Sequence, residues 1–147
     1  MTGNQLNKKN EERASLDLLI SLYPGFPAGK IVHTESPDFI IHSGPRKKIG
    51  VELTRYTQPG FNPNEETNHF IPELTRNGLL DVINAKEQKI PIYQKKILKR
   101  IWLVILVEGF SNSPSFNIQN QLESWKIDSL FESVMLLDLM GERVYVL

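Results

Sequence analysis

Apolar residues near the start of the chain recur every three or four positions, which is the spacing of an amphipathic helix. This stripe consists of Leu16, Leu19, Ile20 and Tyr23. It predicts a helix from Glu11 to Leu22, with Asn10 as the N-cap and Pro24-Gly25 as the stop. Glu12 falls at the N-terminal edge of the apolar face, so its carboxylate is expected at the rim of the core.

The next segment alternates apolar and polar residues, which predicts strands joined by a turn. Ile31 and Val32 open a short strand, Asp38 to His42 form a second, and Ile49 to Thr54 return after the turn Ser43-Gly44-Pro45-Arg46. Because side chains alternate along a strand, two faces are expected on the returning strand. One face carries Ile49, Val51 and Leu53, and the other carries Gly50, Glu52 and Thr54.

The second half of the chain predicts further helices and strands. A helical segment after Pro72 has an apolar stripe that Lys86 interrupts, and Pro91 ends or kinks it. Tyr93 to Arg100 is a basic connection or short helix, and Ile101 to Val107 is short and wholly apolar, as expected of a central strand. The remaining predictions are loops at Gln58 to Asn68 and Asn112 to Asn120, a short helix at Leu122 to Trp125, and strands at Ser133 to Leu139 and Arg143 to Leu147.

The order of these elements predicts a mixed α/β fold, with one central mixed sheet flanked by helices. We expect a flexible N-terminus over residues 1–10 and a single domain over residues 11–147. The chain has 147 residues, enough to bury one core, and ordinary proportions of hydrophobic (40%) and charged (23%) residues. It has no cysteine, which excludes disulfides, thiolate zinc sites and cysteine nucleophiles.

The longest uninterrupted apolar run is Ile101 to Val107, far shorter than the roughly 18 residues of a membrane-spanning helix. Residues 1–10 are polar and lack the apolar core of a signal peptide. A cytoplasmic protein without a membrane partner is therefore expected.

The formal net charge of +0 conceals an asymmetry. Residues 1–100 hold 15 Lys+Arg and 11 Asp+Glu, a net of +4, whereas residues 101–147 hold 2 and 6, a net of −4. The basic residues cluster around residues 46–48 and 86–100. Two interpretations are open: a solvated surface, which is the commoner origin of such clusters, or a groove for a polyanion.

Asp38 and Glu52 are the residues most suggestive of chemistry. Paired as a hairpin, the two strands bring Asp38, at the start of one, near Glu52 on the other. Two converging carboxylates suit a hard divalent cation such as Mg²⁺, which polarises a phosphodiester and activates water. The alternative is a solvent-facing Glu and an Asp that serves a turn. The three histidines (His33, His42 and His69) lack metal-ligand spacing, so structural or exposed roles are favoured for them.

At these carboxylates the sequence resembles the PD-(D/E)XK nuclease superfamily, which has the restriction-endonuclease-like fold. The family pattern is an acid on a first helix, a Pro-Asp that opens a strand, and an acid-x-Lys on the following strand. Pro37-Asp38 matches literally, and Glu52-Leu53-Thr54 matches in its acid, within a resemblance that runs from roughly Glu11 to Val107. The resemblance implies a core of α-β-β-β-α-β, with Asp38 and Glu52 as metal ligands assisted by Glu12.

Thr54 departs from the pattern, because the family has a lysine at this position. Some members carry the lysine on the helix packed beside the site. Lys86 is the best candidate here, since it interrupts an apolar stripe, and Lys89 is the second. The alternative for Lys86 is a lysine whose stem merely covers apolar surface.

These observations lead to three hypotheses. The first is an Mg²⁺- or Mn²⁺-dependent endonuclease that acts on DNA rather than RNA, for which a homodimer would suit cleavage of both strands. Its predicted nucleic-acid contacts are Arg46, Lys47, Lys48, Arg55, Lys95 and Lys96. The second is an inactive domain of the same fold that binds nucleic acid or protein, which Thr54 and the neutral charge favour. The third is an accessory or immunity-type protein that uses its acidic C-terminal part.

Overall fold

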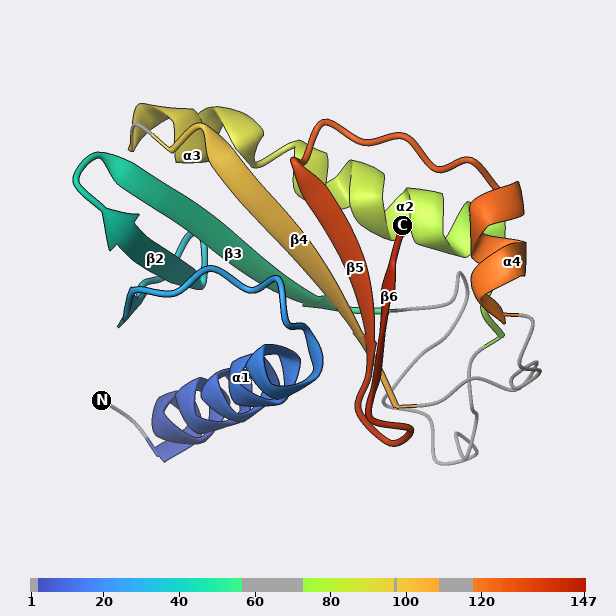
Figure 1. The fold of residues 1–147 in the computed structure, drawn as a ribbon, viewed down its shortest axis with the longest axis horizontal. Coiled ribbons are helices and arrows are strands. Elements are labelled where there is room, and N and C mark those ends of the chain that lie inside the picture. Colours follow the sequence, from blue (N-terminus) through green and yellow to red (C-terminus); the bar gives the residue numbers. More distant parts are fainter. Residues whose placement is uncertain (1–2, 57–72, 97, 109–117) are drawn as a thin grey trace.

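The structure is a computed structural model, and it describes residues 3–56, 73–96, 98–108 and 118–147. Its strands form one six-stranded sheet in the order β1-β2-β3-β4-β5-β6 (Figure 1). The strands are β1 (Lys30–His33), β2 (Phe39–Gly44), β3 (Lys47–Arg55), β4 (Arg100–Val107), β5 (Ser133–Asp138) and β6 (Arg143–Val146). The helices are α1 (Gly3–Leu22), α2 (Arg76–Glu87), α3 (Ile90–Lys95) and α4 (Ile118–Ser124).

The sheet is mixed, as the sequence predicts. β1, β2 and β3 pair in antiparallel fashion, β3, β4 and β5 run parallel, and β6 returns antiparallel to β5. The parallel pairs follow the crossovers through α2–α3 and α4, because parallel neighbours need a long connection. The predicted strand Ile101 to Val107 is confirmed as the central strand β4, whose residues 101–107 are all buried.

Helices cover both faces of the sheet (Figure 1). α1 lies on one face, where Leu16 and Leu19 pack against apolar residues of β2 to β5. The helices α2, α3 and α4 lie on the other face, over a second core that includes Leu79 and Ile83. Within the described residues, no helix is both long and apolar enough to cross a bilayer.

The first helix begins earlier than the sequence predicts. It starts at Gly3, so Asn10 is not an N-cap, and residues 3–10, expected as a flexible terminus, lie in helical turns. These turns are exposed, and no apolar stripe marks them because they cover no core. Periodicity detects only the buried half of such a helix.

The predicted long helical segment is divided into α2 and α3. Thr75 caps the start of α2, where its hydroxyl accepts a hydrogen bond from the Gly78 N–H, and Pro91 lies in the first turn of α3. In the predicted loop at Asn112 to Asn120, the last three residues belong instead to α4, which begins at Ile118, and the others lie outside the described residues. The predicted loop at Gln58 to Asn68 lies outside the described residues.

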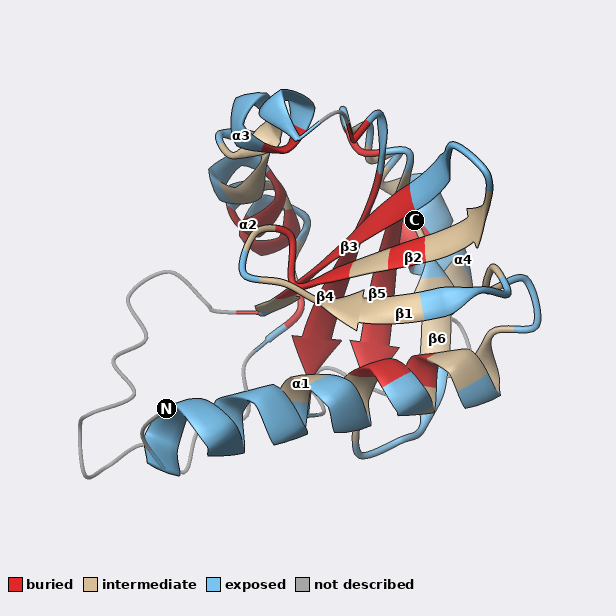
Figure 2. Cartoon of the chain, turned by 90° about the vertical axis from the view of Figure 1, so that its left-hand side faces the viewer, coloured by how far each residue is buried: buried red, intermediate tan, exposed pale blue. Residues whose placement is uncertain are grey.

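Strand β3 extends beyond its neighbour β2, and this difference creates an open edge. The register pairs Phe39 with Val51, so residues 52–55 of β3 have no partner on β2. On its other side β3 stays paired with β4 as far as Arg55. Along this open edge, side chains from the two faces of the sheet come within reach of one another. Figure 2 shows α1 running past this end of the sheet, with the first half of the helix exposed.

Candidate active site at the open edge of strand β3

Asp38 lies directly before β2, across the hairpin from Glu52. Its main-chain carbonyl accepts a hydrogen bond from the Thr34 N–H at 2.8 Å. Its carboxylate Oδ2 accepts one from the Leu53 N–H at 2.7 Å, which satisfies a donor on the open edge of β3. The residue is 9% exposed. The predicted approach of Asp38 to the returning strand is therefore confirmed, and Asp38 is not a solvated turn residue.

Glu52 is still more buried, at 3% exposure, so it is not the solvent-facing residue of the alternative interpretation. The predicted division of faces holds: Val51 and Leu53 pack on the α1 side, whereas Glu52 contacts the α2–α3 side. Its Oε1 lies 3.6 Å from the Lys86 Nζ, and its Oε2 accepts a hydrogen bond from the Tyr93 hydroxyl. Buried carboxylates require such partners.

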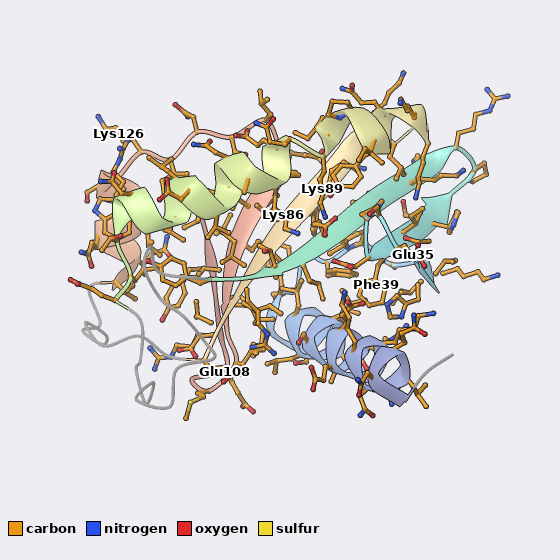
Figure 3. The ribbon with its side chains drawn as sticks, turned by 180° about the vertical axis from the view of Figure 1, so that it is seen from behind. Glu35, Phe39, Lys86, Lys89, Glu108 and Lys126 are labelled. Atoms are coloured by element: carbon orange, nitrogen blue, oxygen red, sulfur yellow. The ribbon has the colours of Figure 1, made fainter. Side chains whose placement is uncertain are left out.

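Lys86 occupies the place that the sequence predicts for a lysine supplied by a neighbouring helix. It projects from the last turn of α2 toward β3, and its side chain is 21% exposed (Figure 3). Thr54, two residues after Glu52 on β3, lines the same pocket as Lys86. Lys89, the second candidate, lies at the start of α3, and no ion pair is recorded for it in the part of the chain described here.

The electrostatic state of Asp38 reflects its neighbours. Burial raises the pKa of Asp38 from its ordinary value of 3.8 to about 7, and the negative charge of Glu52 adds to the increase. The hydrogen bond from Leu53 acts in the opposite direction, and the charge of Glu12 makes a further, smaller contribution to the increase. The two carboxyl groups also share a hydrogen bond when one is protonated. Asp38 and Glu52 therefore form a close acidic pair whose full ionisation is unfavourable without a cation.

Glu12 approaches this pair from α1, on the other face of the sheet. Its Oε2 lies 2.7 Å from the His33 Nε2, and its Oε1 lies 3.8 Å from the Lys8 Nζ. The imidazole of His33 in turn stacks on Phe39, with ring centroids 4.4 Å apart. His33 is thus a half-buried partner of Glu12, the predicted acid of the first helix. The sequence spacing of the histidines gave no indication of this contact.

Tyr93 is the site residue that sequence reasoning misses. Its ring is fully buried, and burial raises the pKa of its hydroxyl above the ordinary value, so it stays protonated and donates to Glu52. The missed signal is that Tyr93 follows Lys86 by seven residues, about two helical turns. Pro91 conceals this relationship, because it suggests that the helical phase is lost between the two residues.

The predicted nucleic-acid contacts do not gather at one place. Lys47 and Lys48 begin β3 and Arg55 ends it, roughly 26 Å away at about 3.3 Å per residue. Arg55 pairs with Glu108 at 3.0 Å, an exposed ion pair that solvent screens. Lys96 donates a hydrogen bond to the Ser36 carbonyl and so holds the loop that precedes Asp38. Arg46 and Lys95 are exposed.

Two adjoining pockets flank Glu12. The larger, about 550 Å³, lies between α1 and the β1–β2 loop and includes Asp38 and His33 in its wall. The smaller, about 280 Å³, lies between α1 and the end of β3 and includes Thr54 and Lys86. Asp38 and Lys86 therefore each line a pocket that is open to the surface, whereas Glu52 lies buried behind them and lines neither pocket.

No set of three or more acidic or histidine side chains within the described ranges is arranged as a metal cage. The predicted ligand set of three is thus divided: Asp38 and Glu52 are adjacent, and Glu12 is held by His33 and Lys8. Comparison with family models, with curated proteins and with solved structures found no match to this chain. The resemblance to PD-(D/E)XK nucleases therefore depends on the residues themselves.

Proposed function

We propose that the chain is a divalent-metal-dependent phosphodiesterase that cleaves nucleic acid, with Asp38, Glu52 and Lys86 at its centre. The observation that carries this proposal is the contact between Lys86 and Glu52, 3.6 Å from Nζ to Oε1, beside the buried Asp38. Two carboxylates and an amine supplied from a neighbouring helix are the minimum chemistry that the resemblance implies, and Thr54 cannot supply the missing charge.

The residues fit a hard cation. Asp38 and Glu52 offer carboxylate oxygens. Burial, and after it the negative charge of Glu52, raises the pKa of Asp38 to about 7, and a bound divalent ion would oppose this increase. Mg²⁺ commonly binds through one or two carboxylates and keeps its remaining ligands as water and substrate phosphate. A pair of carboxylates without a third is therefore sufficient. When bound, the ion supplies charge for the phosphate and lowers the pKa of a water molecule.

The other roles in the proposed reaction belong to groups of the protein itself. The Lys86 ammonium stabilises negative charge that develops on the phosphate oxygens as water adds to phosphorus and the ester oxygen leaves. Tyr93 holds one oxygen of Glu52 and leaves the other directed to Lys86. The Leu53 N–H fixes Oδ2 of Asp38. Each group is held by a separate element, so the arrangement is organised before substrate binds.

DNA is the proposed substrate, and Mg²⁺ or Mn²⁺ the proposed cofactor. The test is cleavage of plasmid and linear DNA in the presence of either ion. Asp38→Asn and Glu52→Gln should abolish cleavage, whereas Asp138→Asn should not. Asp138 is a matched control because it is also 9% exposed, lies on β5 and caps the turn at Met140 and Gly141.

A lysine pair isolates the role of Lys86. Lys86→Met should lower the rate of cleavage by about 10²- to 10³-fold, the usual effect of removing one charge-stabilising group. Lys89→Met should change the rate by less than about threefold. Equal losses in the two variants, or full activity in Asp38→Asn, would contradict the proposed site.

A second candidate function is a non-catalytic module of the same fold. It is favoured by the observation that Glu52 already has two partners, Lys86 and Tyr93, without any metal. In this case the contacts of Glu52 with Lys86 and Tyr93 stabilise the fold, and the chain binds DNA or a protein without cleaving it. DNA binding that persists with neither metal dependence nor cleavage would identify this case.

A further inference from the structure

The exposed half of α1 presents a polar stripe that continues its buried stripe. Leu16 and Leu19 pack into the core, and stepping back from Leu16 by four residues leads to Glu12. The same helical spacing of three and four residues then gives Lys9, Lys8 and Gln5. All four polar residues line the larger pocket. The same face of α1 therefore packs on the core in its second half and forms a pocket wall in its first half.

The two pockets form the two sides of one groove along this stripe, because both include Lys8 and Glu12. Opposite the helix, the groove is bounded by the β1–β2 loop, where Glu35 lies (Figure 3), and by Arg55 and Lys86. Asp38 is part of the same wall. The carboxylate pair therefore reaches the groove through Asp38, away from the β2–β3 turn.

We propose that the N-terminal half of α1 is the binding wall for the sugar–phosphate backbone of the substrate, with Lys8 and Lys9 bound to phosphates beside the one at Asp38 and Glu52. The proposal rests on the function proposed above and names the surface that holds the substrate. In this proposal α1 replaces Lys47 and Lys48 as the principal contact with the sugar–phosphate backbone. These two lysines lie at the opposite end of β3, directly after the β2–β3 turn.

The exposure and charge of the two lysines suit this role. Lys8 is 77% exposed, and its contact with Glu12 at 3.8 Å is a screened surface pair that a phosphate readily replaces. The shorter of the two contacts of Glu12 is with His33, at 2.7 Å, and it joins this half of the helix to β1. The lysines are thus presented by an anchored helix rather than by a loose terminus.

The groove also explains why binding should need a divalent ion. Four cationic residues line the two pockets, namely Lys8, Lys9, Arg55 and Lys86. Four acidic residues line them as well, namely Glu11, Glu12, Glu35 and Asp38. Because these charges balance, the groove alone attracts a polyanion only weakly. A divalent ion bound at the carboxylates would give the groove a net positive charge and so favour binding of the polyanion.

The test is fluorescence anisotropy of a labelled oligodeoxynucleotide with full-length protein, in Ca²⁺ and in EDTA. Wild type should bind only with Ca²⁺. The double variant Lys8→Gln/Lys9→Gln should bind on the order of tenfold more weakly and show a shallower salt dependence, by about 0.7 per lysine on a single strand. Lys8→Arg/Lys9→Arg, which keeps both charges, should bind like wild type. Lys47→Gln/Lys48→Gln is the matched control and should retain affinity within about twofold.

Two outcomes separate this inference from the proposed function. If wild type binds with Ca²⁺ but loses affinity only in the Lys47/Lys48 variant, the α1 wall is wrong and the proposed function stands. If wild type binds no DNA with or without Ca²⁺, the proposed function fails and the wall fails with it. Circular dichroism of each variant confirms that the helix persists, so that lost binding is not lost fold.

Discussion

Glu52 shows how single residues define the site. Its two oxygens have different partners, an ammonium from Lys86 and a neutral hydroxyl from Tyr93. The hydroxyl fixes one oxygen and orients the side chain, and the ammonium is an exchangeable counterion for the other. Outer-shell groups of this kind commonly change metal affinity by about 10- to 100-fold when they are removed.

Tyr93→Phe should therefore weaken binding of Mn²⁺ by about tenfold or more, as measured by isothermal titration calorimetry. It should also lower the free energy of unfolding by about 1–3 kcal/mol, because Glu52 loses a buried donor. Tyr56→Phe is the control, since Tyr56 is another buried tyrosine, hydrogen-bonded to the Glu73 carbonyl and the Thr75 N–H. Equal effects of both variants on Mn²⁺ affinity would show that Tyr93 has only a structural role.

Asp38 should make the stability of the metal-free protein depend on pH. Its folded pKa is raised from 3.8 to about 7, so the folded protein holds this proton more tightly than the unfolded chain. The stabilisation is complete below about pH 4 and is lost as the pH rises through about 7, by as much as roughly 4 kcal/mol at about 1.4 kcal/mol per pKa unit. Asp38→Asn removes the titrating carboxyl group and with it this dependence of stability on pH. Urea unfolding in EDTA at about pH 5 and about pH 8 should show a larger loss in wild type than in Asp38→Asn, and parallel losses would contradict the assignment.

At the scale of elements, the site exists because β3 is longer than β2. Residues 52–55 have no β2 partner, so Glu12 from one face and Lys86 from the other line one pocket around the edge. The Pro37-Asp38 segment closes the start of this edge. The segment packs on β3 at Gly50, where a side chain would meet Pro37.

Gly50→Ala tests this contact. A Cβ at Gly50 would lie 2.7 Å from Ile101 Cδ1 and 2.8 Å from Pro37 Cγ, too close for either to remain in place. Such overpacking should lower the free energy of unfolding by about 1–3 kcal/mol and, by shifting Pro37, weaken metal binding. Gly44→Ala is the control, because its nearest neighbour would be Lys47 Cδ at an ordinary 3.5 Å. Unchanged metal binding in Gly50→Ala would show that Asp38 is positioned independently of β3.

Features of the fold that depend on burial could be predicted from the spacing of apolar residues. Features that bury little or no apolar surface could not be predicted in this way. The alternation around Glu52 assigned it to the correct face, and the interrupted stripe identified Lys86 as the lysine nearest the acids. The first turns of α1 bury nothing, so neither their helical structure nor the position of Lys8 and Lys9 was apparent. The role of Tyr93 depends on how α3 follows α2 after Lys89, which local patterns do not specify.

At the scale of the molecule, the net charge of +0 is the sum of a basic and an acidic part of the chain, and the fold brings these two parts into contact. Two acids of the C-terminal part pair with bases of the first hundred residues, Glu132 with Arg100 at 2.9 Å and Glu108 with Arg55 at 3.0 Å. The groove beside α1 is likewise balanced in charge. A neutral total therefore does not exclude a polyanionic partner, and it predicts that binding depends on divalent ions. The homodimer and the cytoplasmic location stay predictions.

The most direct measurement is thermal melting with and without Mg²⁺ at about pH 8, where Asp38 and Glu52 repel most strongly. Saturating Mg²⁺ should raise the melting temperature of wild type by roughly 5–10 °C, as expected for an ion at about a hundred times its Kd. Asp138→Asn should keep this shift, and Asp38→Asn and Glu52→Gln should lose it. No shift in wild type, or the same shift in Asp38→Asn, would contradict a metal site at the edge of β3.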